Sequence, residues 1–122
     1  MGVITMILKV LIHVNEAERW GVALNSITNM KNGPDGANIE THVISNGHGV
    51  NGFVHQRDQA LPEEIERMKQ LAGRGVRFFA CNNALAKEKI ESKELPDFVD
   101  VVASSMEEIV KRQADGFGYI KP

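Results

Sequence analysis

The chain has 122 residues, of which 43% are hydrophobic, 25% charged and 6% aromatic, and this length and composition predict one domain spanning residues 1–122. Its 14 Lys and Arg residues against 16 Asp and Glu residues give a net charge of −2, without a run of like charge. Nucleic-acid binding normally needs a basic stripe that displaces counterions from phosphates, so we exclude this class of function.

The first predicted element is a buried strand over residues 6–14. This segment is a nearly continuous apolar run rich in branched side chains, which is typical of a parallel strand covered on both faces. It is interrupted by Lys9 and falls far short of the roughly 20 residues that a membrane span needs, so we expect no membrane segment. Residues 1–5 we interpret as a leader or as a remnant of the expression vector.

An amphipathic helix follows this strand. Asn15 is predicted to cap its first turn, with Glu18 in the capping-box position three residues later. Apolar residues then recur at steps of three and four, which predicts one buried stripe on the helix. The stripe consists of Ala17, Trp20, Leu24, Ile27 and Lys31, with Ala23 and Met30 beside it. The sequence Gly-Pro-Asp-Gly at 33–36 ends the helix.

The middle of the chain predicts a strand over 39–45, a helix from Pro62 and a strand over 76–80. Pro62 suits the first helical position, and Gly73 suits the position just after the helix. The apolar stripe of this helix is predicted to be Ile65, Met68, Leu71 and Ala72.

The last third predicts a short helix over 82–91, a strand over 98–103, a further helix and a short strand over 117–120. Ser104 and Glu107 form a capping box for the second of these helices. Its predicted apolar stripe is Met106, Ile109, Val110 and Ala114.

Strands and helices therefore alternate along the whole chain. Strict alternation is typical of parallel strands joined by right-handed crossovers, with helices on both faces of the sheet. The sequence predicts an α/β fold, a three-layer α/β/α sandwich with a five-stranded, mainly parallel sheet. The order of the strands does not follow from the sequence.

In such a sheet, ligands bind beyond the carboxyl ends of the strands, where loops and helix N-termini gather. Each predicted strand brings polar residues to that edge. They are His13, Asn15 and Glu16 after the first strand, Asn46, Gly47, His48 and Gly49 after the second, Cys81, Asn82 and Asn83 after the third, and Ser104 and Ser105 after the fourth.

Cys81 is the single cysteine of the chain, so no internal disulfide can form and a reducing, cytoplasmic compartment is expected. One interpretation is a small buried hydrophobe, because free cysteines are among the most buried residues. The other is a reactive thiolate, because a thiol at a helix N-terminus faces unpaired N–H groups that lower its pKa from about 8.5.

The other residues at this edge have alternative interpretations as well. Asn82 and Asn83 are helix caps, or one of them hydrogen-bonds a substrate or the sulfur. His13 is a satisfied core histidine or the partner of the thiol. His48 lies in a glycine-rich segment that we interpret as a flexible loop, with closure over Cys81 as the functional alternative.

Motifs for cofactors, metals and hydrolases are weak. The sequence of residues 47–52 matches G-x-G-x-x-G, but it follows the second strand and lacks the acidic residue expected about 20 positions later. No HExxH, CxxC, Walker A or G-x-S-x-G motif is present, so neither a metal nor a cofactor is expected. A Cys-His hydrolase remains open, because its residues need only meet in space.

Three segments carry a resemblance to a known family. The strand-end sequence VRFFACNNAL at 76–85 resembles the cysteine segment of the DsrE/DsrF-like family. The opening KVLIHVNE at 9–16, Asn46-Gly47 and the closing QADGFGYIKP at 113–122 also resemble an uncharacterised branch of that family. The resemblance implies a three-layer α/β/α fold and assembly into a homo-oligomer, a trimer or hexamer. It also implies that Cys81 accepts sulfur as a persulfide and passes it to another protein.

Three functions remain open. The first is an intracellular sulfur-relay protein, a persulfide carrier or sulfurtransferase-like protein, with Cys81 as nucleophile and His13, Asn15, Asn46, Gly47, His48, Asn82 and Asn83 as binding or supporting residues. This function requires that a partner can reach Cys81. The second is a non-catalytic oligomer that binds a small ligand or nucleotide, with Cys81 lining the pocket. The third is a structural role in a heteromeric complex.

Overall fold

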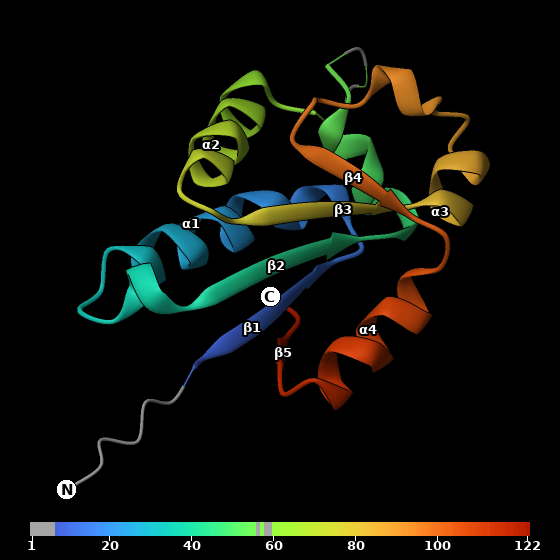
Figure 1. The fold of residues 1–122 in the computed structure, drawn as a ribbon. Helices are drawn as coiled ribbons and strands as arrows, with labels where there is room; N and C mark the ends of the chain where they lie inside the picture. Colours follow the sequence, from blue (N-terminus) through green and yellow to red (C-terminus); the bar gives the residue numbers. More distant parts are fainter. Residues whose placement is uncertain (1–6, 56, 58–59) are drawn as a thin grey trace, which may run out of the picture.

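The computed structural model describes residues 7–55, 57 and 60–122 (Figure 1). The leader interpretation for residues 1–5 lies outside the described residues, as does the first residue of the strand predicted over 6–14. In the described part, strands and helices alternate along the chain as the sequence predicted.

The sheet has five strands, all parallel, in the order β4-β3-β2-β1-β5 (Figure 1). The strands are β1 (Lys9–Val14), β2 (Glu40–Ser45), β3 (Arg77–Cys81), β4 (Val99–Val102) and β5 (Gly118–Ile120). Cys81 pairs with Val102, and Ser45 pairs with Val14. The carboxyl ends of β1 to β4 therefore meet at one edge of the sheet.

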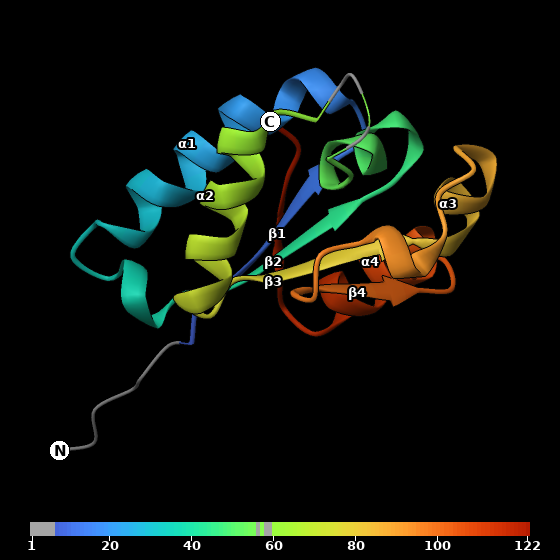
Figure 2. The same cartoon turned by 90° about the horizontal axis from the view of Figure 1, so that it is seen from above.

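Helices cover both faces of the sheet. The helices α1 (Trp20–Lys31) and α2 (Pro62–Gly73) lie side by side on one face, and α4 (Ser105–Ala114) lies on the other (Figures 1 and 2). The short helix α3 (Asn82–Lys87) follows β3 directly. Short 3-10 helices are η1 (Ala17–Arg19), η2 (Gly36–Asn38), η3 (Gly47–Phe53) and η4 (Ser92–Glu94). The predicted three-layer α/β/α sandwich is confirmed.

Two hydrophobic cores lie on opposite sides of the sheet. The larger core, under α1 and α2, is built around the fully buried side chains of Trp20, Phe53, Met68 and Phe78. The smaller core, under α4, consists of Leu11, Ile44, Phe79, Ile109 and Phe117. The stripe predicted for α1 is confirmed, and even Lys31 is 6% exposed, with Nζ donating to Ile39 O at 2.7 Å.

Helix boundaries differ from the predictions at two N-termini. The chain stays extended at Glu16 and enters a 3-10 turn at Ala17, so the cap predicted for Asn15 is wrong. Cys81 itself occupies the N-cap position of α3, and neither Asn82 nor Asn83 acts as the cap. The cap predicted at Ser104 is confirmed, because its hydroxyl accepts from the N–H of Glu107.

Two helix C-termini also differ. The helix predicted over 82–91 ends at Lys87, because Lys89 adopts a φ of 55° that turns the chain back and buries Ile90. Gly73 is the last residue of α2, and the left-handed position belongs to Gly75, whose φ is 92°.

The stripe predicted for α4 is wrong in part. Ser105 and Ile109, four residues apart, face the sheet and are buried. Met106 and Val110 occupy the next positions around the helix and are 64% and 61% exposed. The smaller core needs only one large side chain from this helix, which leaves the neighbouring apolar side chains at the surface.

The glycine-rich segment after β2 is not the flexible loop that we expected. It forms η3, in which Gly49 to Phe53 are all buried. Trp20 Nε1 donates to Gly49 O at 2.8 Å, and a Cβ on Gly52 would lie 2.4 Å from the Trp20 indole. The glycines are therefore required for close packing against Trp20 rather than for motion or phosphate binding.

No helix in the ranges that the structure describes is both long enough and apolar enough to cross a membrane.

Candidate functional site

The candidate site lies where β3 ends. Cys81 is the last residue of β3, and α3 starts at the next residue, so the thiol lies where a strand end meets a helix N-terminus. The same edge holds Asn46 after β2 and Ser105 at the start of α4. The expectation that Cys81 lies at the carboxyl edge of the sheet agrees with this geometry.

Cys81 is 4% exposed, yet its environment is polar. Burial raises the pKa of the thiol, but hydrogen bonds to the sulfur outweigh this effect and hold the pKa below its ordinary value. The donors are the Ser105 hydroxyl and the backbone N–H groups of Asn83, Ala84 and Ser105. These groups therefore make the thiolate of Cys81 more accessible than that of a free cysteine.

Cys81 lines a pocket of about 220 Å³, well above the roughly 10–15 Å³ that one water molecule requires. Among the residues that the structure describes, Lys87 is the charged residue in the lining, which includes no acidic one. The full lining is Asn46, Gly47, Cys81, Asn83, Ala84, Lys87, Ser104, Ser105 and Met106. Space for a small group thus adjoins the thiol despite its burial.

His13 does not contact Cys81 directly but is connected to it through other side chains. Its Nε2 lies 2.8 Å from Asn46 Oδ1, and its Nδ1 lies 2.7 Å from the Tyr119 hydroxyl. Asn46 Nδ2 in turn donates to Ser105 Oγ at 2.9 Å. His13 is 8% exposed, so these contacts satisfy both of its ring nitrogens within the protein.

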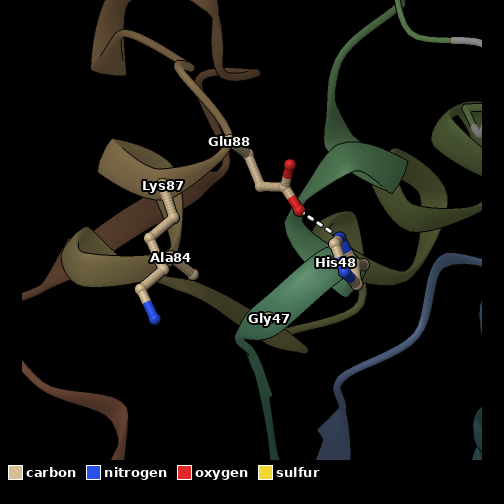
Figure 3. A pocket seen from close by; sticks show the side chains of 5 residues that line it. All are labelled: Gly47, His48, Ala84, Lys87 and Glu88. Carbon is tan, nitrogen blue, oxygen red and sulfur yellow. Dashed lines mark hydrogen bonds and ion pairs between the residues drawn. The ribbon is translucent and has the colours of Figure 1, made fainter.

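A second pocket of about 260 Å³ adjoins the first and shares Gly47, Ala84 and Lys87 with it. His48 and Glu88 complete its lining, and Figure 3 shows their side chains pointing toward one another, His48 from η3 and Glu88 from the position directly after α3. A hydrogen bond between His48 and Glu88 links η3 to the end of α3. His48 therefore belongs to the neighbouring pocket, not to the surroundings of the sulfur.

The remaining predicted site residues contribute mainly through the backbone. Gly47 adopts a φ of 52°, and its Cβ would lie 3.2 Å from Asn15 O. The same Asn15 carbonyl accepts from the N–H of Gly49 at 3.2 Å. Asn83 supplies a backbone N–H to the sulfur, whereas Asn82 is exposed and lines neither pocket.

Sequence reasoning missed the roles of Ser105, Lys87 and Tyr119. Ser105 was placed at the correct edge, but its link to Asn46 depends on how α4 sits beside β2 and β3. Tyr119 pairs with Leu11 because β5 is next to β1, and this neighbourhood follows only from the strand order. No signal in the sequence pattern indicated that the last strand reaches His13.

A metal centre finds no support in the described ranges. Over residues 7–55, 57 and 60–122, no group of three or more His, Cys, Asp or Glu side chains is arranged to hold a metal ion.

Comparisons with known proteins identify the family. The model of the DsrE/DsrF-like family matches residues 2–122. This chain, an α/β/α domain with a parallel sheet and a cysteine at a strand end, therefore belongs to the DsrE/DsrF-like family. The resemblance seen in the sequence is confirmed.

Two solved structures share the fold. The protein of unknown function MTH1491 from Methanobacterium thermoautotrophicum is 29% identical, with a TM-score of 0.80 over 94% of this chain and 99% of that one. The ychN protein from E. coli is 13% identical, with a TM-score of 0.67 and the same coverage of 94% and 99%. Among curated proteins, no match was found.

Proposed function

We propose that this protein carries sulfane sulfur on Cys81 as a persulfide and hands it to an acceptor thiol. The observation that supports this function best is the surroundings of the thiol, where a hydroxyl and three backbone N–H groups lower its pKa and Cys81 lines a pocket. Such donors favour the thiolate, which is the form that attacks a sulfur–sulfur bond. Membership in a family with sulfur-relay proteins adds to this support.

The chemistry requires no further oxidant or reductant. The Cys81 thiolate attacks the outer sulfur of a donor persulfide, R–S–S⁻. A bond forms between Sγ and that sulfur, the donor S–S bond breaks, and its electron pair leaves on R–S⁻, which then takes a proton. In the hand-off, an acceptor thiolate attacks the outer sulfur of the Cys81 persulfide and Cys81 leaves as thiolate.

Several features of the site suit this role. The Cys81 persulfide is an anion near neutral pH, and Lys87 places a positive charge on the lining of its pocket. The chain has one cysteine, so no internal thiol can resolve the persulfide into a disulfide. We place this activity in the reducing cytoplasm, with a sulfur donor or acceptor protein as partner.

Intact-protein mass after incubation with inorganic polysulfide tests loading. We expect wild type to gain the mass of one sulfur atom, reversibly with dithiothreitol, while Cys81→Ser gains none. The same gain on Cys81→Ser would show that another residue carries the sulfur, and no gain on wild type would contradict the function.

A second function has one observation in its favour. Cys81 is 4% exposed, and the pocket of about 220 Å³ that it lines adjoins a second of about 260 Å³, as expected of a site that binds a small ligand without covalent chemistry. Under this alternative, Cys81→Ala keeps full ligand affinity and cellular function. Loss of both on this substitution would favour the sulfur carrier.

A further inference from the structure

Four side chains from four segments of the chain are hydrogen-bonded in series, and the last of them, Ser105, lines the Cys81 pocket. Tyr119 lies in β5, His13 in β1, Asn46 after β2 and Ser105 at the first position of α4. The distances are 2.7 Å from Tyr119 Oη to His13 Nδ1, 2.8 Å from His13 Nε2 to Asn46 Oδ1, and 2.9 Å from Asn46 Nδ2 to Ser105 Oγ. Ser105 lines the same pocket as Cys81, and its hydroxyl is one of the groups that lower the pKa of the Cys81 thiol.

The direction of each hydrogen bond follows from the one before it. Asn46 donates through Nδ2 to Ser105, so its Oδ1 is the acceptor that faces His13. A neutral His13 must then carry its proton on Nε2, which leaves Nδ1 to accept from the Tyr119 hydroxyl. With a lone pair of Ser105 Oγ engaged by Asn46, the Ser105 proton is directed to the sulfur.

We propose that Tyr119, His13, Asn46 and Ser105 form a one-way hydrogen-bond chain in which every donor points toward Cys81, and that Ser105 is the positioning residue that holds the sulfur as an anion beside its pocket. Donors in series polarise one another, so each member strengthens the last bond. A residue closer to Cys81 in this hydrogen-bond chain should therefore change the pKa of the thiol more than a residue further away. This inference deepens the proposed function, because the persulfide and the departing thiolate are anions that the same Ser105 proton would stabilise.

The charged groups around the sulfur are few. Lys87 of α3 lines the pocket, and His48 and Glu88 face one another in the adjoining pocket. On α4, Glu108 is paired with Arg112 at 2.7 Å, and the Glu107 backbone N–H donates to the Ser104 hydroxyl. His13, from β1, is itself a member of the hydrogen-bond chain. None of these charges needs to change in the variants that test the proposal.

The test is the pH dependence of the alkylation rate of Cys81 by iodoacetamide, which needs no sulfur donor. We expect Ser105→Ala to raise the apparent pKa of the thiol by about one pH unit, which is tenfold less thiolate at pH values below both pKa values. Asn46→Ala, which frees the Ser105 hydroxyl to rotate, should raise it less, and Tyr119→Phe by a few tenths of a unit.

Ser104→Ala is the matched control, because Ser104 lines the same pocket but its hydroxyl caps α4. It should keep the thiol pKa of wild type. Circular dichroism checks that each variant is folded. The proposed hydrogen-bond chain would be contradicted by a thiol pKa unchanged in Ser105→Ala or by an equal rise of this pKa in Ser104→Ala. A larger rise in Tyr119→Phe than in Asn46→Ala would contradict it as well. Failure of wild type to load sulfur, with the pKa order intact, would instead overturn only the proposed function.

Discussion

At the scale of single residues, His42 shows how strongly the smaller core acts on an ionisable group. Its ring packs against Phe79 and Phe117, with centroid distances of 5.4 and 4.8 Å, and its Nδ1 accepts from Arg112 Nε at 2.9 Å. Burial first, and then the nearby Arg112 charge, lower the pKa of His42 from 6.5 to about 4, despite the opposing Glu40. The folded protein therefore keeps this histidine neutral at mildly acidic pH.

This lowered pKa predicts a loss of stability in acid. Between pH 6.5 and 4 the unfolded chain binds a proton at His42 that the folded chain does not, so the free energy of unfolding falls as the pH falls. We expect this group to contribute a loss of roughly 3 kcal/mol by pH 4. Urea denaturation at pH 7 and pH 4 measures it.

His42→Gln keeps an acceptor for Arg112 without a titrating ring, and it should lack this part of the acid sensitivity. His55→Gln, at the exposed His55, is the control and should behave as wild type. An acid loss in His42→Gln as large as in wild type would mean that other groups cause it.

Lys87 predicts a charge preference at the thiol. Because Lys87 is the charged residue of the Cys81 pocket, it should favour anionic reagents over neutral ones. In Lys87→Gln we expect the ratio of the alkylation rates with iodoacetate and iodoacetamide to fall about two- to fivefold, the size expected of one solvated charge a few ångströms away. Lys93→Gln, at an exposed lysine on η4, should leave the ratio unchanged, and an equal fall there would assign the effect to net charge.

At the scale of elements, the packing of η3 against α1 predicts which glycine the fold requires. A Cβ on Gly52 would lie 2.4 Å from two atoms of the Trp20 indole, whose side chain is fully buried and held by its bond to Gly49 O. Gly52→Ala should therefore lower the free energy of unfolding by about 1–3 kcal/mol. Chemical denaturation followed by tryptophan fluorescence measures the change.

Gly73 offers the matched control for this substitution. Nothing lies within 4 Å of a Cβ added there, and it ends α2. Gly73→Ala should leave the stability unchanged or raise it by up to about 1 kcal/mol. If Gly52→Ala and Gly73→Ala were equally stable, the close packing of η3 against Trp20 would not be the reason that a glycine is needed at position 52.

Strands and helices were predictable from the sequence where the spacing of apolar residues and the presence of branched side chains indicated the same element. The strands 39–45 and 76–80 and the stripe of α1 were found because a buried face leaves a repeating apolar pattern. The exposed Met106 and Val110 could not be distinguished from a buried stripe, because the pattern does not reveal how wide a face the sheet covers. The 3-10 form of η3 was missed because its glycines serve packing, which glycine content alone does not distinguish from flexibility.

The candidate site was predictable in part for a similar reason. Cys81, Asn46 and His13 follow or end strands, and parallel strands bring their ends to one edge. The order β4-β3-β2-β1-β5 then decides which of these residues are neighbours, and it is set by tertiary packing. This order brings Tyr119 to His13, and the placement of α4 brings Ser105 to Cys81.

At the scale of the whole molecule, family membership leads us to expect self-association into a trimer or hexamer. Met106 and Val110 of α4 are exposed apolar side chains, and Met106 also lines the Cys81 pocket. If copies associate through this surface, Val110→Glu should reduce the oligomer, measured by light scattering after size-exclusion chromatography. Gln113→Glu, at an exposed position of the same helix, adds the same single negative charge and is the control. A monomeric wild type would contradict the expectation.

The central claim is that Cys81 both accepts sulfur and gives it away, and hand-off tests this more directly than loading, which any reactive thiol could show. Wild type loaded with polysulfide and freed of excess donor would be mixed with a second thiol protein, and the intact masses of both followed in time. We expect one sulfur atom to leave wild type as one appears on the acceptor, and Cys81→Ser to transfer none. A loaded Cys81 that keeps its sulfur in the presence of the acceptor would contradict the carrier and leave a pocket-lining cysteine.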